Sequence, residues 1–81
     1  DFVVPAAELA ATAEIYARRL ASGPTLAYGA IKRTILSART ESFETQLEHE
    51  AQALAALAST DDAREGLSAF AARRKPEFRG R

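Results

Sequence analysis

The sequence contains no cysteine, no methionine and no tryptophan, and only 7% of its residues are aromatic. Without cysteine the chain can form neither disulfide bonds nor thiolate metal sites. It also lacks any apolar run near the roughly 18 residues that a membrane-spanning helix needs. We therefore expect a cytoplasmic protein that does not cross a membrane.

The chain has no excess of charge of one sign, since 11 basic residues face 11 acidic ones. Such a balance creates no long-range field that would attract nucleic acid or an anionic membrane, so neither is an expected partner. Hydrophobic residues make up 47% of the 81 residues, which is typical of one small globular domain. Much of this share is alanine, which buries little area. We therefore expect the chain to depend on a partner, a second copy or a further domain.

Residues that could run a reaction are also scarce. The single histidine, His49, lies between Glu48 and Glu50. Neighbouring helical positions diverge by roughly 100°, so these three side chains cannot converge on one metal ion. The glycines are scattered rather than gathered in a phosphate-binding loop; they lie at positions 23, 29, 66 and 80. We expect no catalytic residue and no metal site in this chain.

Hydrophobic periodicity predicts an all-α fold of about four short helices. The expected helices cover residues 5–22, 24–39, 43–58 and 60–74, followed by an extended tail over 75–81. Gly23 is expected to close the first helix in the left-handed conformation, and Ser42 to cap the third. Gly29 weakens the second helix by up to about 1 kcal/mol relative to alanine. Its presence indicates either a close contact or a tolerated weakness.

The fourth predicted helix has a start signal, a stop signal and an apolar stripe. Ser59 is expected to be its N-cap and to accept a hydrogen bond from the backbone N–H of Asp62. Pro76 is expected to end it. One predicted apolar stripe runs along it, through Ala63, Leu67, Phe70, Ala71 and Arg74.

Near the end of this helix, Phe70 and Arg73 are three residues apart and are predicted to point the same way. A ring beside a guanidinium could hold a planar anionic group such as a nucleotide. The alternative is a capped helix whose cations, Arg73, Arg74 and Lys75, are simply solvated.

The first residues, 1–5, are apolar and β-prone and are expected to be the end of a strand from a longer protein. Other positions form a more specific pattern: Asp62-x-x-Glu65-Gly66-x-x-Ala69-Phe70-x-x-Arg73-Arg74-x-Pro76-x-Phe78-x-Gly80. Together with Val3-Val4-Pro5, Glu8-Leu9, Pro24, Ala27, Lys32 and Glu50, this pattern resembles the C-terminal segment of the crotonase family, which contains enoyl-CoA hydratases and isomerases. The resemblance covers essentially the whole chain.

The resemblance implies that this is a helical oligomerisation domain of a trimer-type enzyme of fatty acid metabolism. The catalytic core would lie in a missing N-terminal domain, and a coenzyme A (CoA) thioester would be the substrate, with no covalently bound cofactor. It also implies that Phe70 and Arg73 approach the adenosine end of CoA. The family usually has lysine where this chain has Arg73, so the charge is kept while the contact geometry differs.

The sequence also bears on two other classes of function. A free-standing helical module that docks a partner helix would also explain an exposed apolar stripe. An acyl carrier protein is disfavoured, because such proteins are strongly acidic and carry an Asp-Ser-Leu triplet that this neutral sequence lacks.

Overall fold

The computed structural model describes residues 3–81, and all regular secondary structure in this range is helical. A 3₁₀ turn, Ala6–Glu8, leads into α1 (Leu9–Ala21), and the other helices are α2 (Thr25–Ser37), α3 (Phe43–Ala58) and α4 (Asp61–Ala71). The expected all-α fold with four helices is confirmed. None of the helices in the described part of the chain is long and apolar enough to cross a membrane.

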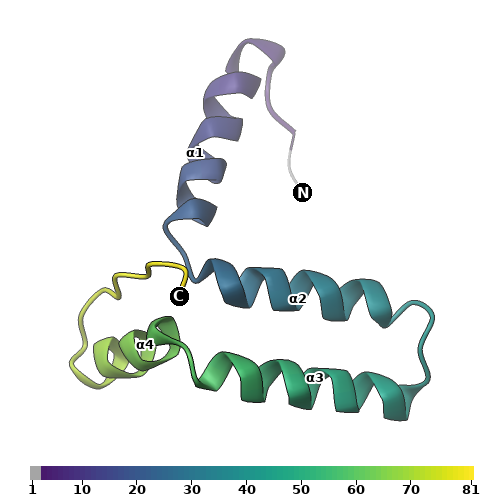
Figure 1. Ribbon diagram of the computed structural model, residues 1–81. Coiled ribbons are helices and arrows are strands. Elements are labelled where there is room, and N and C mark those ends of the chain that lie inside the picture. Colours follow the sequence, from purple (N-terminus) through teal and green to yellow (C-terminus); the bar gives the residue numbers. More distant parts are fainter. Residues whose placement is uncertain (1–2) are drawn as a thin grey trace.

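The helices form an open arrangement rather than a closed bundle (Figure 1). Helices α2 and α3 lie side by side, α1 projects away from them, and the last residues return along α4 towards the start of α2. The radius of gyration is 16.0 Å, whereas a compact domain of this length would have about 12 Å. Among the described residues only Ala30, Asp62 and Ala69 are buried. The chain therefore has almost no core of its own.

Polar side chains join α2 to α3. The Gln46 amide donates to the carbonyl oxygen of Thr34 at 3.0 Å and accepts from the Ser37 hydroxyl at 2.9 Å. Ala30 is buried on α2, and its small side chain suits a close approach of the two helices. Ser42 caps α3 as expected, because its hydroxyl accepts from the backbone N–H of Thr45 at 3.2 Å.

Gly23 and Gly29 differ in how closely other side chains approach them. Gly23 is not in the left-handed conformation, since the only described residues with positive φ are Arg73 and Gly80. Instead, the Tyr28 ring lies over it, and two ring carbons would be 2.7 Å from a Cβ added at Gly23. At Gly29 an added Cβ would meet only the end of the Arg33 side chain, at 3.6 Å, so no close contact within the described residues requires a glycine there.

The first residues of the chain and the bounds of the first two helices differ from the expectation. Residues 3–5 form no strand, and residues 1–2, which belong to the same predicted strand, lie outside the described residues. The first helix begins at Leu9 rather than at residue 5, because residues 6–8 adopt the tighter 3₁₀ turn. The second ends at Ser37, before the expected residue 39, while α3 spans the expected residues 43–58.

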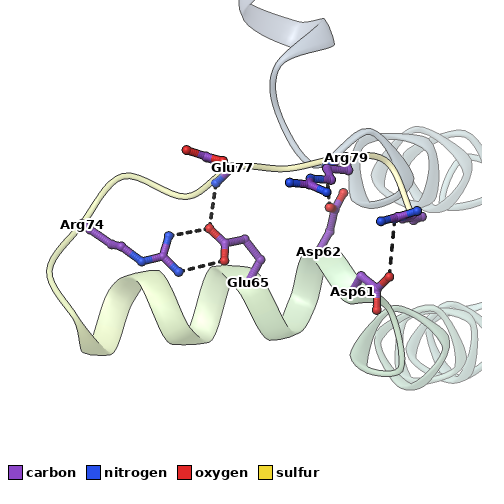
Figure 2. A pocket seen from close by; sticks show the side chains of 7 residues that line it. Asp61, Asp62, Glu65, Arg74, Glu77 and Arg79 are labelled. Carbon is purple, nitrogen blue, oxygen red and sulfur yellow. Dashed lines mark hydrogen bonds and ion pairs between the residues drawn. The ribbon is translucent and has the colours of Figure 1, made fainter.

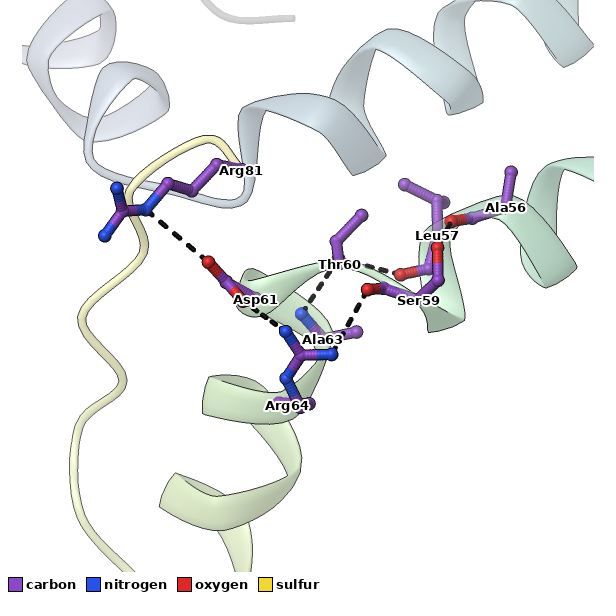
Figure 3. Close-up of polar contacts among 8 residues, drawn as sticks. All are labelled: Ala56, Leu57, Ser59, Thr60, Asp61, Ala63, Arg64 and Arg81. Atoms are coloured by element: carbon purple, nitrogen blue, oxygen red, sulfur yellow. Dashed lines mark hydrogen bonds and ion pairs between the residues drawn. The ribbon is translucent and has the colours of Figure 1, made fainter.

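The N-cap of α4 is Thr60 and not Ser59. The Thr60 hydroxyl accepts from the backbone N–H of Ala63 at 3.1 Å, whereas the Ser59 hydroxyl donates back to the carbonyl oxygen of Ala56 at 2.9 Å (Figure 3). Arg64 reinforces this corner by donating to the carbonyl oxygen of Ser59 at 3.2 Å. The cap lies one residue later than expected because Ser59 keeps a helical backbone as the C-cap of α3, whereas Thr60 has the extended backbone, with ψ of 156°, that an N-cap requires.

Candidate functional site

Two carboxylates on one face of α4 hold the last residues of the chain, 74–81, which we call the tail. Asp62 and Glu65 are three apart in sequence, and both side chains point from α4 towards the tail (Figure 2). Residues at this spacing share a helix face. The tail consequently runs back along α4 in the opposite direction, and the two form a hairpin.

Asp62 makes the most extensive of these attachments. Its two carboxylate oxygens accept from the backbone N–H groups of Arg79, at 2.7 Å, and Gly80, at 2.9 Å. Its own backbone N–H donates to the carbonyl oxygen of Arg81 at 2.8 Å. This N–H belongs to the first turn of α4, where backbone donors have no partner within the helix. Asp62 is only 5% exposed, so a buried charge is satisfied entirely by the tail backbone.

Glu65 makes the second attachment. Its carboxylate receives two hydrogen bonds from the Arg74 guanidinium, at 2.6 and 2.8 Å, and a third from the backbone N–H of Glu77 at 2.8 Å. The Phe78 ring lies over Gly66, at 3.6 Å from where a Cβ would be. Ala69, one turn further along the same face, is 1% exposed. The tail therefore covers this face of α4.

The charges in the cleft between α4 and the tail are largely neutralised by these pairs. The cleft is open, with a volume of about 530 Å³, and all its lining residues are charged: Asp61, Asp62, Glu65, Arg74, Glu77, Arg79 and Arg81. Arg81 approaches Asp61 at 3.6 Å (Figure 3). No group of three potential metal ligands gathers within residues 3–81. Most of the charged side chains that line the cleft are thus engaged in holding the tail against α4.

Acid is expected to weaken the attachment at Glu65. The hydrogen bonds from Arg74, and then that from the Glu77 N–H, lower the pKa of Glu65 from 4.5 to about 2. Because the folded state binds this proton more weakly than the unfolded chain, the stabilisation is complete above about pH 4.5 and is lost as the pH falls to about 2. The melting temperature of the native protein should exceed that of Glu65→Gln by a constant amount near neutral pH, and the two should converge near pH 2. A pH-independent difference would contradict this assignment.

The helix end places Phe70 and Arg73 differently from the prediction. Helix α4 ends at Ala71, and the backbone N–H groups of Arg73 and Arg74 donate to the carbonyl oxygens of Phe70 and Ala69, at 3.1 and 3.0 Å. These two bonds define a Schellman turn, in which the residue after the C-cap is left-handed and is usually glycine. Here that residue is Arg73, with φ of 52°. Pro76 is not what ends the helix, and Arg73 is not a helical neighbour of Phe70.

The predicted apolar stripe of α4 is not its buried face. Leu67 is 74% exposed and Phe70 is 86% exposed, whereas the face that carries Asp62 and Ala69 is covered by the tail. The hairpin therefore has an attached inner face and an open outer face, with Phe70 close to its turn and Arg73 within it.

The sequence interpretation missed the structural role of Asp62 and Glu65, because acidic residues near a helix start are explained by the helix dipole alone. Their three-residue spacing, with an arginine and a glycine further on, was the available signal. Nothing in the sequence alone showed that the tail folds back to meet them.

Comparisons with known proteins identify the family. The whole chain, residues 1–81, matches the family model described as enoyl-CoA hydratase/isomerase. The 1,2-epoxyphenylacetyl-CoA isomerase of Escherichia coli K12 is 44% identical over 79 residues, which are 98% of this chain and 30% of that protein. The probable enoyl-CoA hydratase of Rhodobacter capsulatus is 37% identical over 65 residues, which are 80% of this chain and 25% of that protein.

A solved structure gives the same result in three dimensions. An enoyl-CoA hydratase from Geobacillus kaustophilus HTA426 superimposes with a TM-score of 0.92 and 34% sequence identity. The match covers 98% of this chain and 30% of the solved chain. The 81 residues therefore span less than a third of the relatives that they match.

Proposed function

The chain belongs to the enoyl-CoA hydratase/isomerase family, and from this premise we propose that it is the C-terminal helical part of an enzyme that acts on CoA thioesters. The observation that carries the proposal is the match of the whole chain to this family, over only 30% of the length of its E. coli relative. In the parent enzyme, the reaction would be the hydration or isomerisation of an enoyl-CoA thioester through an enolate. The catalytic groups would lie outside these 81 residues.

The open architecture supports a role in assembly. Large hydrophobic side chains are exposed on every helix, among them Leu9, Ile35, Leu54 and Leu67. A contiguous exposed apolar surface is typical of a protein interface. We propose that these surfaces cover the core domain and sister copies in a homo-oligomer of the trimer type. A cytoplasmic location, expected from the absence of cysteine, remains a prediction.

The turn at the end of α4 supports the proposed contact with CoA. Phe70 offers an exposed ring, and Arg73 extends from a turn that is anchored on both sides. A guanidinium can form forked hydrogen bonds with phosphate, and an aromatic ring can stack on a purine base. Phe70 and Arg73 would thus hold the adenosine and phosphate end of the substrate.

The test compares the complete protein with the isolated 81 residues in crotonyl-CoA hydration. We expect turnover by the complete protein and none by the purified segment, because the segment has no groups to stabilise an enolate or to move protons. Robust turnover by the segment would refute the proposal. If the chain is instead a free-standing interaction module, the gene will encode no catalytic domain before Asp1, and no form of the protein will bind CoA.

A further inference from the structure

We propose that Asp62 is a positioning residue for the nucleotide end of the substrate, acting through the tail on Arg73. This inference rests on the proposed contact between Arg73 and CoA. Asp62 does not touch the ligand; it helps to keep a strained turn on an open surface in one conformation.

The Asp62 side chain is almost entirely removed from solvent. A carboxylate that is 5% exposed would be strongly unfavourable without compensation. Compensation comes from two consecutive backbone N–H groups, those of Arg79 and Gly80, and from its place in the first turn of α4, where the helix dipole favours negative charge. Backbone hydrogen bonds to a carboxylate are about twice as strong as neutral ones. The attachment therefore fixes the backbone of the tail rather than one of its side chains.

Gly80 defines the geometry at the far end of the tail. Gly80 has φ of +71°, a conformation that side chains disfavour, and a Cβ there would lie 2.8 Å from the Thr25 hydroxyl oxygen. The tail thus lies between the start of α4 and the start of α2, where a side chain at position 80 would be strained and would force Thr25 to shift. Asp62 is the residue of α4 that receives it.

Arg73 adopts a left-handed conformation that costs energy for any residue except glycine. Such a conformation persists only where the surrounding structure imposes it. On one side of Arg73 lies α4, and on the other lies the tail, which is tied to that helix by Glu65 and, further on, by Asp62. Without the Asp62 attachment, the tail side of the turn would be held mainly by the solvent-exposed contacts of Glu65, and Arg73 would leave its strained conformation more often.

The experiment uses the complete protein and two probes, CoA and pantetheine, which lacks the nucleotide. In Asp62→Asn the amide keeps one acceptor and turns a donor towards a backbone N–H, so the attached state becomes less populated. Only molecules with an ordered turn bind the nucleotide tightly, so we expect the dissociation constant of CoA to rise about tenfold. The dissociation constant of pantetheine should not change. Isothermal titration calorimetry measures both.

The matched control is Asp61→Asn. Asp61 is the adjacent carboxylate on the same turn, but it pairs with the side chains of Arg64 and Arg81 and accepts no hydrogen bond from the tail backbone. The Asp61→Asn substitution should leave the dissociation constants of CoA and pantetheine within about twofold of the native values, because exposed ion pairs contribute little to stability. Gly80→Ala disturbs the same attachment from the tail side and should reproduce the effect of Asp62→Asn.

The outcomes separate this inference from the function on which it rests. Equal losses for CoA and pantetheine in Asp62→Asn would mean a general structural defect and overturn the positioning role. Unchanged CoA binding in both Asp62→Asn and Gly80→Ala would overturn it as well, while a loss in Arg73→Ala would still uphold the CoA contact. If Arg73→Ala binds CoA normally, the contact itself is wrong and the positioning role falls with it.

Discussion

Replacing Ala69 with leucine is expected to lower the free energy of unfolding by about 1–3 kcal/mol and to displace the tail. Ala69 is 1% exposed and lies one turn beyond Glu65 on the face that the tail covers. Three additional carbon atoms have no space there unless the tail moves. Movement of the tail would stretch the hydrogen bonds that end at Asp62 and Glu65, so the cost includes part of both attachments.

The measurement is equilibrium denaturation of the complete protein. Ala71→Leu provides the control, since it adds the same atoms to the same helix at a position that this chain leaves exposed. Its effect should stay within about 0.5 kcal/mol. Equal effects of the two substitutions would show that the tail does not lie against Ala69.

The arrangement of helices along the chain could be predicted from the sequence, because it depends on local signals. Ser42 precedes a regular apolar pattern and caps α3 as its position implied. The family was also correctly identified from the motif that runs from Asp62 to Gly80. Both signals lie within short stretches of sequence, where the spacing of residues directly determines their geometry.

Local sequence patterns did not predict the N-cap of α4, where two neighbouring residues can both act as the cap. They also did not predict contacts between segments that lie far apart in the sequence. Ser59 and Thr60 are both good capping residues, and the choice between them depended on how α3 ends. Asp62 meets residues 17 and 18 positions further on, which no periodicity predicts. Such contacts require knowledge of where the tail turns.

The buried face of α4 was misjudged for a related reason. Hydrophobic patterns find the face that packs against other hydrophobic side chains, and they selected Leu67 and Phe70. Within this chain, however, α4 packs against the tail through hydrogen bonds to its backbone and to Arg74 and through the Phe78 ring, so its covered face carries two acids and small residues, including Gly66 and Ala69. The exposed apolar face fits a surface made for something outside these residues, which is what a chain without a core of its own requires.

Replacing Arg73 with glycine is expected to separate stability from binding, because the two depend on this residue in opposite ways. Glycine adopts the left-handed conformation at position 73 without strain, so the free energy of unfolding should stay constant or rise by up to about 1 kcal/mol. The same substitution removes a guanidinium proposed to bind phosphate. Loss of a charge-assisted hydrogen bond should weaken CoA binding by about tenfold to a hundredfold.

Thermal unfolding and calorimetric titration of the complete protein measure the two effects, with Arg73→Lys as the control that keeps the charge. The lysine variant should retain most of the affinity, and it should gain no stability because lysine is as strained in this turn as arginine. Reduced stability together with reduced affinity in Arg73→Gly would contradict the argument, since it would mean that the arginine side chain supports the fold. If Arg73→Gly is more stable but binds CoA poorly, then the left-handed Arg73 lowers the stability of the native protein. Its contribution would then be to place the guanidinium where CoA binds.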